Sequence, residues 1–79
     1  MNDAEVQVAY EILRYLVKHP SAQDTLEGIV GWWFLGRSKY PKALVKKALE
    51  LMVDDGLIIK HQGSDARNIY KLYRPRNKK

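Results

Sequence analysis

The first apolar pattern in the chain has the period of a helix. Asn2 and Glu5 have the spacing of a capping box, and His19-Pro20 interrupts the pattern, so we expect a helix from Asn2 or Asp3 to about Lys18. Its apolar residues recur every three or four positions and predict a stripe that faces the core. These residues are Val6, Ala9, Tyr10, Leu13, Leu16 and Val17.

Val8, Ile12 and Tyr15 widen that stripe beyond the width that one small core needs. Two interpretations follow. In one, neighbouring elements bury both flanks of the helix. In the other, these three residues form a self-association face and give a weak homodimer.

A second helix is predicted from Asp24 to about Leu35, because Asp24 and Glu27 have the spacing of a capping box. One face of this helix carries Leu26, Ile29, Val30 and Trp33. Trp32 lies about 100° away from Trp33 around the helix, so the two indoles cannot both face the core. We expect Trp32 to pack at the edge of the first or third helix; the alternative is an aromatic residue that binds a partner.

A turn over residues 36–40 leads to a third helix over residues 41–55, with Pro41 in its first turn and Gly56 after its end. This helix has two distinct faces. The apolar face carries Leu44, Val45, Ala48, Leu49, Leu51 and Met52. The outer face carries Lys42, Ala43, Lys46, Lys47, Glu50 and Asp54, with the lysines first and the acidic residues last. A phosphate-bearing partner would therefore meet the N-terminal half of the helix.

Two short apolar runs follow, at residues 57–59 and 69–73, and they predict an antiparallel hairpin with Gly63 in its tip. Since a lone hairpin is marginally stable in water, we expect it to lie against the helices. The predicted fold class is α+β, with three helices and a C-terminal hairpin. The predicted core contains Leu13, Leu16, Ile29, Trp33, Leu44, Ala48, Leu49, Met52, Leu57 and Leu72.

Length and composition fit one small domain over residues 1–74, followed by a basic, disordered tail at residues 75–79. The chain of 79 residues has no cysteine, which excludes disulfides and fits a reducing cytoplasm. Its longest run of apolar residues and glycine, residues 28–36, is too short to span a bilayer, and its start is polar and acidic. We expect a cytoplasmic protein that does not enter a membrane.

Charge is distributed unevenly along the chain. Residues 1–35 contain two basic and five acidic residues, whereas residues 36–79 contain twelve basic and four acidic residues. A clustered positive field attracts a polyanion more strongly than dispersed charges do, so the second half is the candidate binding surface. The alternative is an ordinary solvated surface.

Catalytic and metal-binding patterns are not visible. His19 precedes a proline and His61 ends a predicted strand, and neither has a cysteine or a second histidine at metal-ligand spacing. Gly28 and Gly31 belong to a helix that contains tryptophan, so they do not form a phosphate-binding loop. We expect no enzyme activity, no metal and no cofactor.

The junction at residues 48–58, Ala-Leu-Glu-Leu-Met-Val-Asp-Asp-Gly-Leu-Ile, is followed by the return strand Ile-Tyr-Lys-Leu at residues 69–72. This arrangement resembles the winged helix-turn-helix superfamily, in particular small bacterial regulator-like domains, over about residues 4–74. The resemblance implies a winged helix that binds double-stranded DNA and regulates transcription. The superfamily also includes protein-interaction modules that do not bind DNA, which is the alternative function.

The resemblance also assigns the site, with the third helix in the major groove and the hairpin on nearby backbone. It places Lys42, Ala43 and Lys46 toward the groove and Ser38, Lys39 and Lys47 on flanking phosphates. It assigns Lys60, Arg67 and Asn68 to the wing. Lysine lacks the fixed two-point geometry of arginine and asparagine on base edges, so this helix face favours phosphate attraction over sharp sequence recognition.

Overall fold

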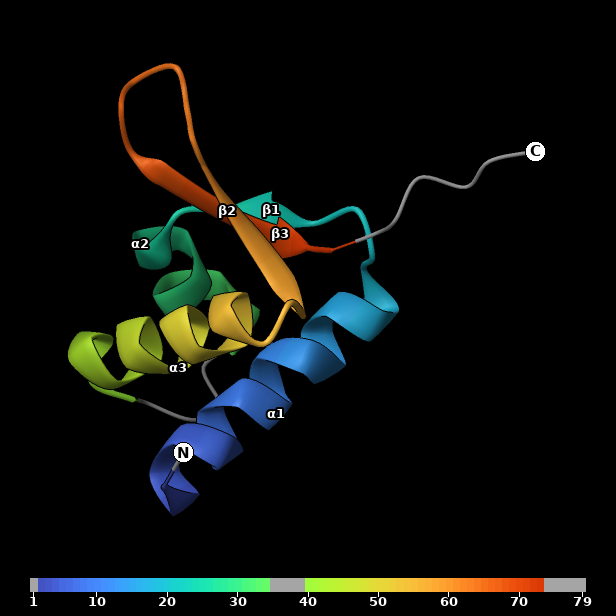
Figure 1. Cartoon of the computed structure of the whole chain (residues 1–79), viewed down its shortest axis with the longest axis vertical. Helices are drawn as coiled ribbons and strands as arrows, with labels where there is room; N and C mark the ends of the chain where they lie inside the picture. The colour runs from blue at the N-terminus through green and yellow to red at the C-terminus, as the bar shows by residue number, and fades with distance from the viewer. Residues whose placement is uncertain (1, 35–39, 74–79) are drawn as a thin grey trace.

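The computed structural model describes residues 2–34 and 40–73 of the chain. In chain order, the elements are α1 (Asp3–Lys18), β1 (Gln23–Asp24), α2 (Leu26–Gly28), the π-helix η1 (Ile29–Trp33), α3 (Lys42–Asp54), β2 (Ile58–Gln62) and β3 (Asn68–Leu72). The second predicted helix corresponds to α2 and η1, which are continuous. Figure 1 shows an α+β domain in which the helices lie on one side of a three-stranded antiparallel sheet of order β1-β3-β2.

Helix α1 has the ends that its sequence predicts. The Asn2 side chain accepts a hydrogen bond from the Glu5 backbone N–H at 2.8 Å, and the Glu5 carboxylate accepts one from the Asn2 N–H at 3.0 Å. This capping box satisfies two backbone donors that a helix start leaves free. The helix ends at Lys18, before His19 and Pro20.

The start predicted for the second helix was wrong by one residue. Thr25, not Asp24, is the N-cap, and its hydroxyl accepts a hydrogen bond from the Gly28 N–H at 3.2 Å. Asp24 is extended because it belongs to strand β1, which the sequence did not predict. Its carboxylate accepts the Thr25 N–H and packs against Gly28 so closely that a side chain at that position would displace it.

Strand β3 is the centre of the sheet. The predicted hairpin is confirmed, with Ile58 of β2 opposite Leu72 and Gln62 opposite Asn68. On the other edge of β3, β1 pairs Gln23 with Lys71. The short β1 therefore ties the loop after α1 to the hairpin.

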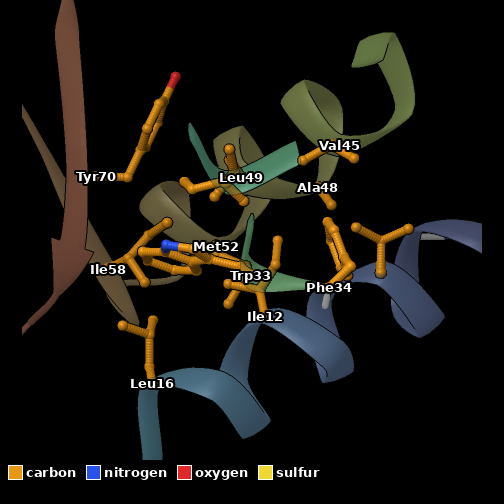
Figure 2. Close-up of a cluster of buried hydrophobic side chains, with 12 residues drawn as sticks. Ile12, Leu16, Trp33, Phe34, Val45, Ala48, Leu49, Met52, Ile58 and Tyr70 are labelled. Atoms are coloured by element: carbon orange, nitrogen blue, oxygen red, sulfur yellow. The ribbon is translucent and has the colours of Figure 1, made fainter. Parts of the chain in front are cut away.

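One apolar core joins the helices and the hairpin (Figure 2). Its buried residues are Val8, Ile12, Leu16, Ile29, Trp33, Phe34, Val45, Ala48, Leu49, Met52, Ile58 and Tyr70. Most of the predicted core is confirmed, although Leu13, Leu44 and Leu72 are only partly buried. The prediction that Leu57 belongs to the core was wrong, because this residue is 42% exposed. Leu57 lies in the bend between α3 and strand β2, just before the buried Ile58.

The face of α1 that packs in the core differs from the predicted one. Val6, Tyr10 and Val17, which we expected to face the core, are exposed, whereas Val8 and Ile12 have no exposed surface. The self-association face predicted at Val8, Ile12 and Tyr15 is therefore wrong, since the monomer buries the first two residues and half-buries Tyr15. The apolar arc of α1 is as wide as the sequence indicates. However, α1 packs on α3 with the flank that carries Val8 and Ile12, not with the flank that carries Val6, Tyr10 and Val17.

The structure confirms the prediction that only one of the two tryptophans faces the core, but not the predicted position of the other. Trp33 is buried and stacks on Tyr15 with ring centroids 4.8 Å apart. Trp32 was expected to pack at a helix edge, but it is 72% exposed. One helix cannot direct adjacent side chains to the same core, and no described neighbour covers the second indole.

The packing of α1 gives a direct test of its orientation. Replacement of Ile12 by alanine removes fully buried methylene and methyl groups, so it should destabilise the protein by about 2–5 kcal/mol. Replacement of Val17 by alanine removes exposed atoms and should change the free energy of unfolding by less than about 0.5 kcal/mol. Urea denaturation followed by circular dichroism measures both values, and equal costs would contradict this orientation.

Candidate nucleic-acid interface

Helix α3 separates its buried and exposed residues as the sequence predicts. Val45, Ala48, Leu49 and Met52 are buried. The outer arc is exposed throughout, and it consists of Lys42, Ala43, Lys46, Lys47, Glu50 and Asp54. The three lysines therefore reach solvent from the N-terminal half of the helix, while the acidic residues lie nearer its C-terminal end.

These lysines lie at the end of α3 where a helix dipole disfavours positive charge. Lys42 is the first helical residue, and Pro41 before it provides no side-chain cap. The Pro41 carbonyl instead accepts the N–H groups of Leu44 and Val45 at 3.0 and 3.1 Å. The stability of the helix does not explain why the lysines precede the acidic residues. Such an order is expected where the lysines serve to bind a partner.

The hairpin lies on the same side of the molecule as this end of α3. In Figure 1 it projects beyond α2, toward the side where α3 begins. Lys60 is paired with the buried Tyr70, and Asn68 lies two residues before Tyr70 on the same strand. Side chains two residues apart in a strand share a face, so Lys60 and Asn68 extend the hairpin face that covers the helices.

Glu27 of α2 contacts Lys42, the first lysine of α3. Its carboxylate forms an ion pair with the Lys42 ammonium group at 2.8 Å. The Lys42 hydrogen bond lowers the pKa of Glu27 below its ordinary value, and the charge of Arg67 also contributes. Glu27 is thus close enough to respond to both α3 and the hairpin tip.

Arg67 forms hydrogen bonds to Asp65, a residue of the same hairpin turn. Its Nε donates to Asp65 Oδ2 at 2.9 Å, and its backbone N–H donates to Asp65 Oδ1 at 3.2 Å. These hydrogen bonds, the backbone one first, lower the pKa of Asp65. Ala66, between the two, has a φ of 72°, so the turn holds a non-glycine residue in the left-handed region. In the free protein, the carboxylate of Asp65 therefore balances the positive charge of Arg67.

Tyr70 connects the hairpin to both helices of the surface. Its ring is buried in the same core as Leu49, and its hydroxyl points away from the other labelled side chains (Figure 2). Burial raises the pKa of the Tyr70 phenol, and the nearby charges of Glu50 and Glu27 raise that pKa further. Sequence reasoning treated Tyr70 as a strand residue only and did not place Glu27 or Asp65 in the site.

The structure brings part of the predicted site together. Lys42, Ala43, Lys46 and Lys47 lie on one arc of α3, and Lys60, Arg67 and Asn68 are exposed on the hairpin. Ser38 and Lys39 lie outside the described residues, as does the basic tail. Lys46, Lys47 and Lys60 have no ion-pair partner within residues 2–34 and 40–73.

The described residues contain neither a metal-binding cluster nor a membrane-spanning helix. Histidine and acidic side chains do not gather into a group able to hold a metal ion among the described residues. Within those residues, no helix has the length and apolar character needed to cross a bilayer. No protein-family model, curated protein or solved structure matches this chain.

The position of Tyr70 predicts a loss of stability at alkaline pH. The folded protein raises the pKa of this phenol above its ordinary value of 10.0. The resulting contribution to stability is complete below pH 10 and is lost as the pH rises through the folded-state pKa. The wild-type protein should therefore lose more stability between pH 9 and pH 11 than Tyr70→Phe, by about 1 kcal/mol or less. Urea denaturation at both pH values measures this, and equal losses would contradict the assignment.

Proposed function

We propose that this protein is a winged-helix, DNA-binding factor of the small transcription-regulator type, with α3 as its recognition helix and the β2–β3 hairpin as its wing. One observation carries the proposal: the N-terminal half of α3, which has three exposed lysines, begins on the side of the molecule toward which the hairpin projects (Figure 1). A helix with a basic outer face and an adjacent hairpin can engage the major groove and the neighbouring phosphates together.

The dimensions of α3 suit this role. Its 13 residues extend over about 20 Å, and the major groove of B-DNA, about 12 Å wide, admits one helix. Ala43 is small and lies between the exposed lysines, which allows the helix backbone to approach the base edges. Lys46 and Lys47 would reach phosphates, and Lys60 would do so from the wing.

The chemistry of the surface favours backbone contacts. Lysine offers a point charge, whereas sharp base recognition generally depends on two-point contacts from arginine, asparagine or glutamine. The outer arc of α3 contains none of these three residue types. We therefore propose strongly salt-dependent binding with modest preference among DNA sequences.

Glu27 would limit the affinity of this surface. Its carboxylate occupies Lys42 and adds a negative charge close to Arg67. On DNA, Lys42 would exchange this carboxylate for a phosphate, and the unpaired Glu27 would then face the polyanion. Binding would thus include the loss of one ion pair and a new repulsion.

A DNA titration at several salt concentrations tests the proposed surface. Contact with about four to six phosphates gives a slope of log affinity against log salt of roughly −4 to −5. Lys46→Glu should weaken binding to all duplexes by a similar factor, on the order of tenfold, and make the slope shallower by about one. The control is Lys18→Glu, which makes the same charge change at an exposed position on α1. Equal effects of both variants, or no binding at low salt, would contradict the proposal.

Removal of the Glu27 charge should have the opposite effect. Glu27→Gln frees Lys42 and removes a repulsion, so DNA affinity should rise by about two- to fivefold. Glu11→Gln removes the same charge from α1, which lies outside the proposed interface, and should leave affinity nearly unchanged. Fluorescence anisotropy with one labelled duplex compares the two variants. A gain of the same size in both would show that net charge alone sets the affinity.

One observation favours a second function, a winged-helix protein-interaction module without DNA binding. Trp32 is 72% exposed, and a large aromatic side chain in that state is typical of a protein-binding position. If the wild-type protein does not bind DNA at low salt, this becomes the leading function.

A further inference from the structure

Helix α1 carries an apolar stripe on its solvent side. Val6, Tyr10 and Val17 expose 49%, 57% and 68% of their surface, and Leu13 is half-buried. These four residues follow one another at intervals of four, three and four positions. This is the spacing of the apolar seam along which two helices pack.

Of the four residues of this stripe, only Leu13 packs against the core of the monomer. The fully buried residues of α1 lie on another row of the helix, which consists of Val8, Ile12 and Leu16. In Figure 1, α3 lies along one side of α1, and no described element runs along its other side. Exposure of a continuous apolar row on a small protein is a feature of interaction surfaces.

The stripe contains an open depression. It is lined by Tyr10, Leu13, Arg14, Val17 and Lys18. Four residues at positions i, i+3, i+4 and i+7 form the hole that accepts a side chain from a facing helix. The Arg14 guanidinium carbon lies 5.8 Å from the centre of the Tyr10 ring. This cation–π contact joins two of the residues that form the hole.

Charges beside the stripe indicate the direction of a facing helix. Asp3 and Gln7 border its N-terminal half, whereas Arg14 and Lys18 border its C-terminal half. An antiparallel second copy would place its Lys18 near Asp3 and its Arg14 near Gln7. A parallel copy would instead place like charges together, so the charge order favours the antiparallel pair.

We propose that two copies of this chain associate through antiparallel α1 helices related by a two-fold axis. Val6 of one copy then lies opposite Val17 of the other, and Tyr10 enters the hole bordered by Leu13 and Arg14. The interface is isologous, since each copy contributes the same stripe and the same hole. The proposal stands independently of DNA binding, because it uses none of the residues of α3 or the hairpin.

The association should be weak. The stripe from Val6 to Val17 extends about 16 Å along the helix, so the interface belongs to the small class, below about 1,200 Å². Monomer and dimer should therefore exchange, with the dimer fraction rising as the protein concentration increases.

Sedimentation analysis from about 10 μM to 1 mM tests the association, because weak interfaces populate dimers in this range. The wild-type protein should shift toward the dimer, whereas Tyr10→Glu, with a charge at the centre of the stripe, should stay monomeric. Tyr73→Glu is the control, since it makes the same substitution at another exposed tyrosine, outside α1. It should associate like the wild type. Wild-type protein that is monomeric throughout, or equal loss of association in both variants, would overturn the proposal.

Single-cysteine variants test the helix direction, since the natural chain has no cysteine. In an antiparallel pair, positions 6 and 17 of different copies are adjacent, while two copies of position 6 are about 16 Å apart, too far for a disulfide. A mixture of Val6→Cys and Val17→Cys should therefore form a disulfide-linked dimer under mild oxidation, and neither variant alone should. Circular dichroism verifies that both fold. Cross-linking within either variant alone, or none in the mixture, would overturn the antiparallel arrangement.

Discussion

Burial of one face of α3 positions α1, α2 and the hairpin around it. Val45, Ala48, Leu49 and Met52 have no exposed surface, and they fill the space between α1 and the hairpin. Full burial of a valine, leucine or methionine side chain contributes about 1.5–3 kcal/mol, which exceeds the terms that oppose lysine near a helix start. The apolar face can therefore impose an orientation that turns the basic arc outward.

The same burial explains which parts of the fold could be predicted. The apolar residues of α3 occupy a single arc, so only one orientation buries them, and the sequence was sufficient. In α1 the apolar arc is wide enough to allow two orientations. The choice between Val8–Ile12 and Val6–Tyr10 depends on where α3 packs, which is a tertiary contact that helical periodicity does not contain. Strand β1 was missed for a related reason, since two residues become a strand only because β3 is available beside them.

The candidate site was predictable as a set of cations, but its charge balance was not. Helical spacing placed Lys42, Lys46 and Lys47 on one exposed arc. The pair between Lys42 and Glu27 joins α2 to α3, so it depends on how those helices pack. Arg67 and Asp65 are neighbours in sequence, yet their pairing depends on a turn whose backbone the residue types did not specify. The free surface is consequently less positive than the count of lysines and arginines indicates.

We propose that the outer arc of α3 and the face of the hairpin that carries Lys60 and Asn68 form one DNA-binding surface. NMR titration of isotope-labelled protein with a short duplex tests this claim most directly, because it locates the contact without any substitution. Amide shifts should change first in residues 42–47 and around Lys60 and Asn68, and those of α1 should change little. Shifts confined to Trp32 or to the α1 stripe, or no shifts at low salt, would contradict it.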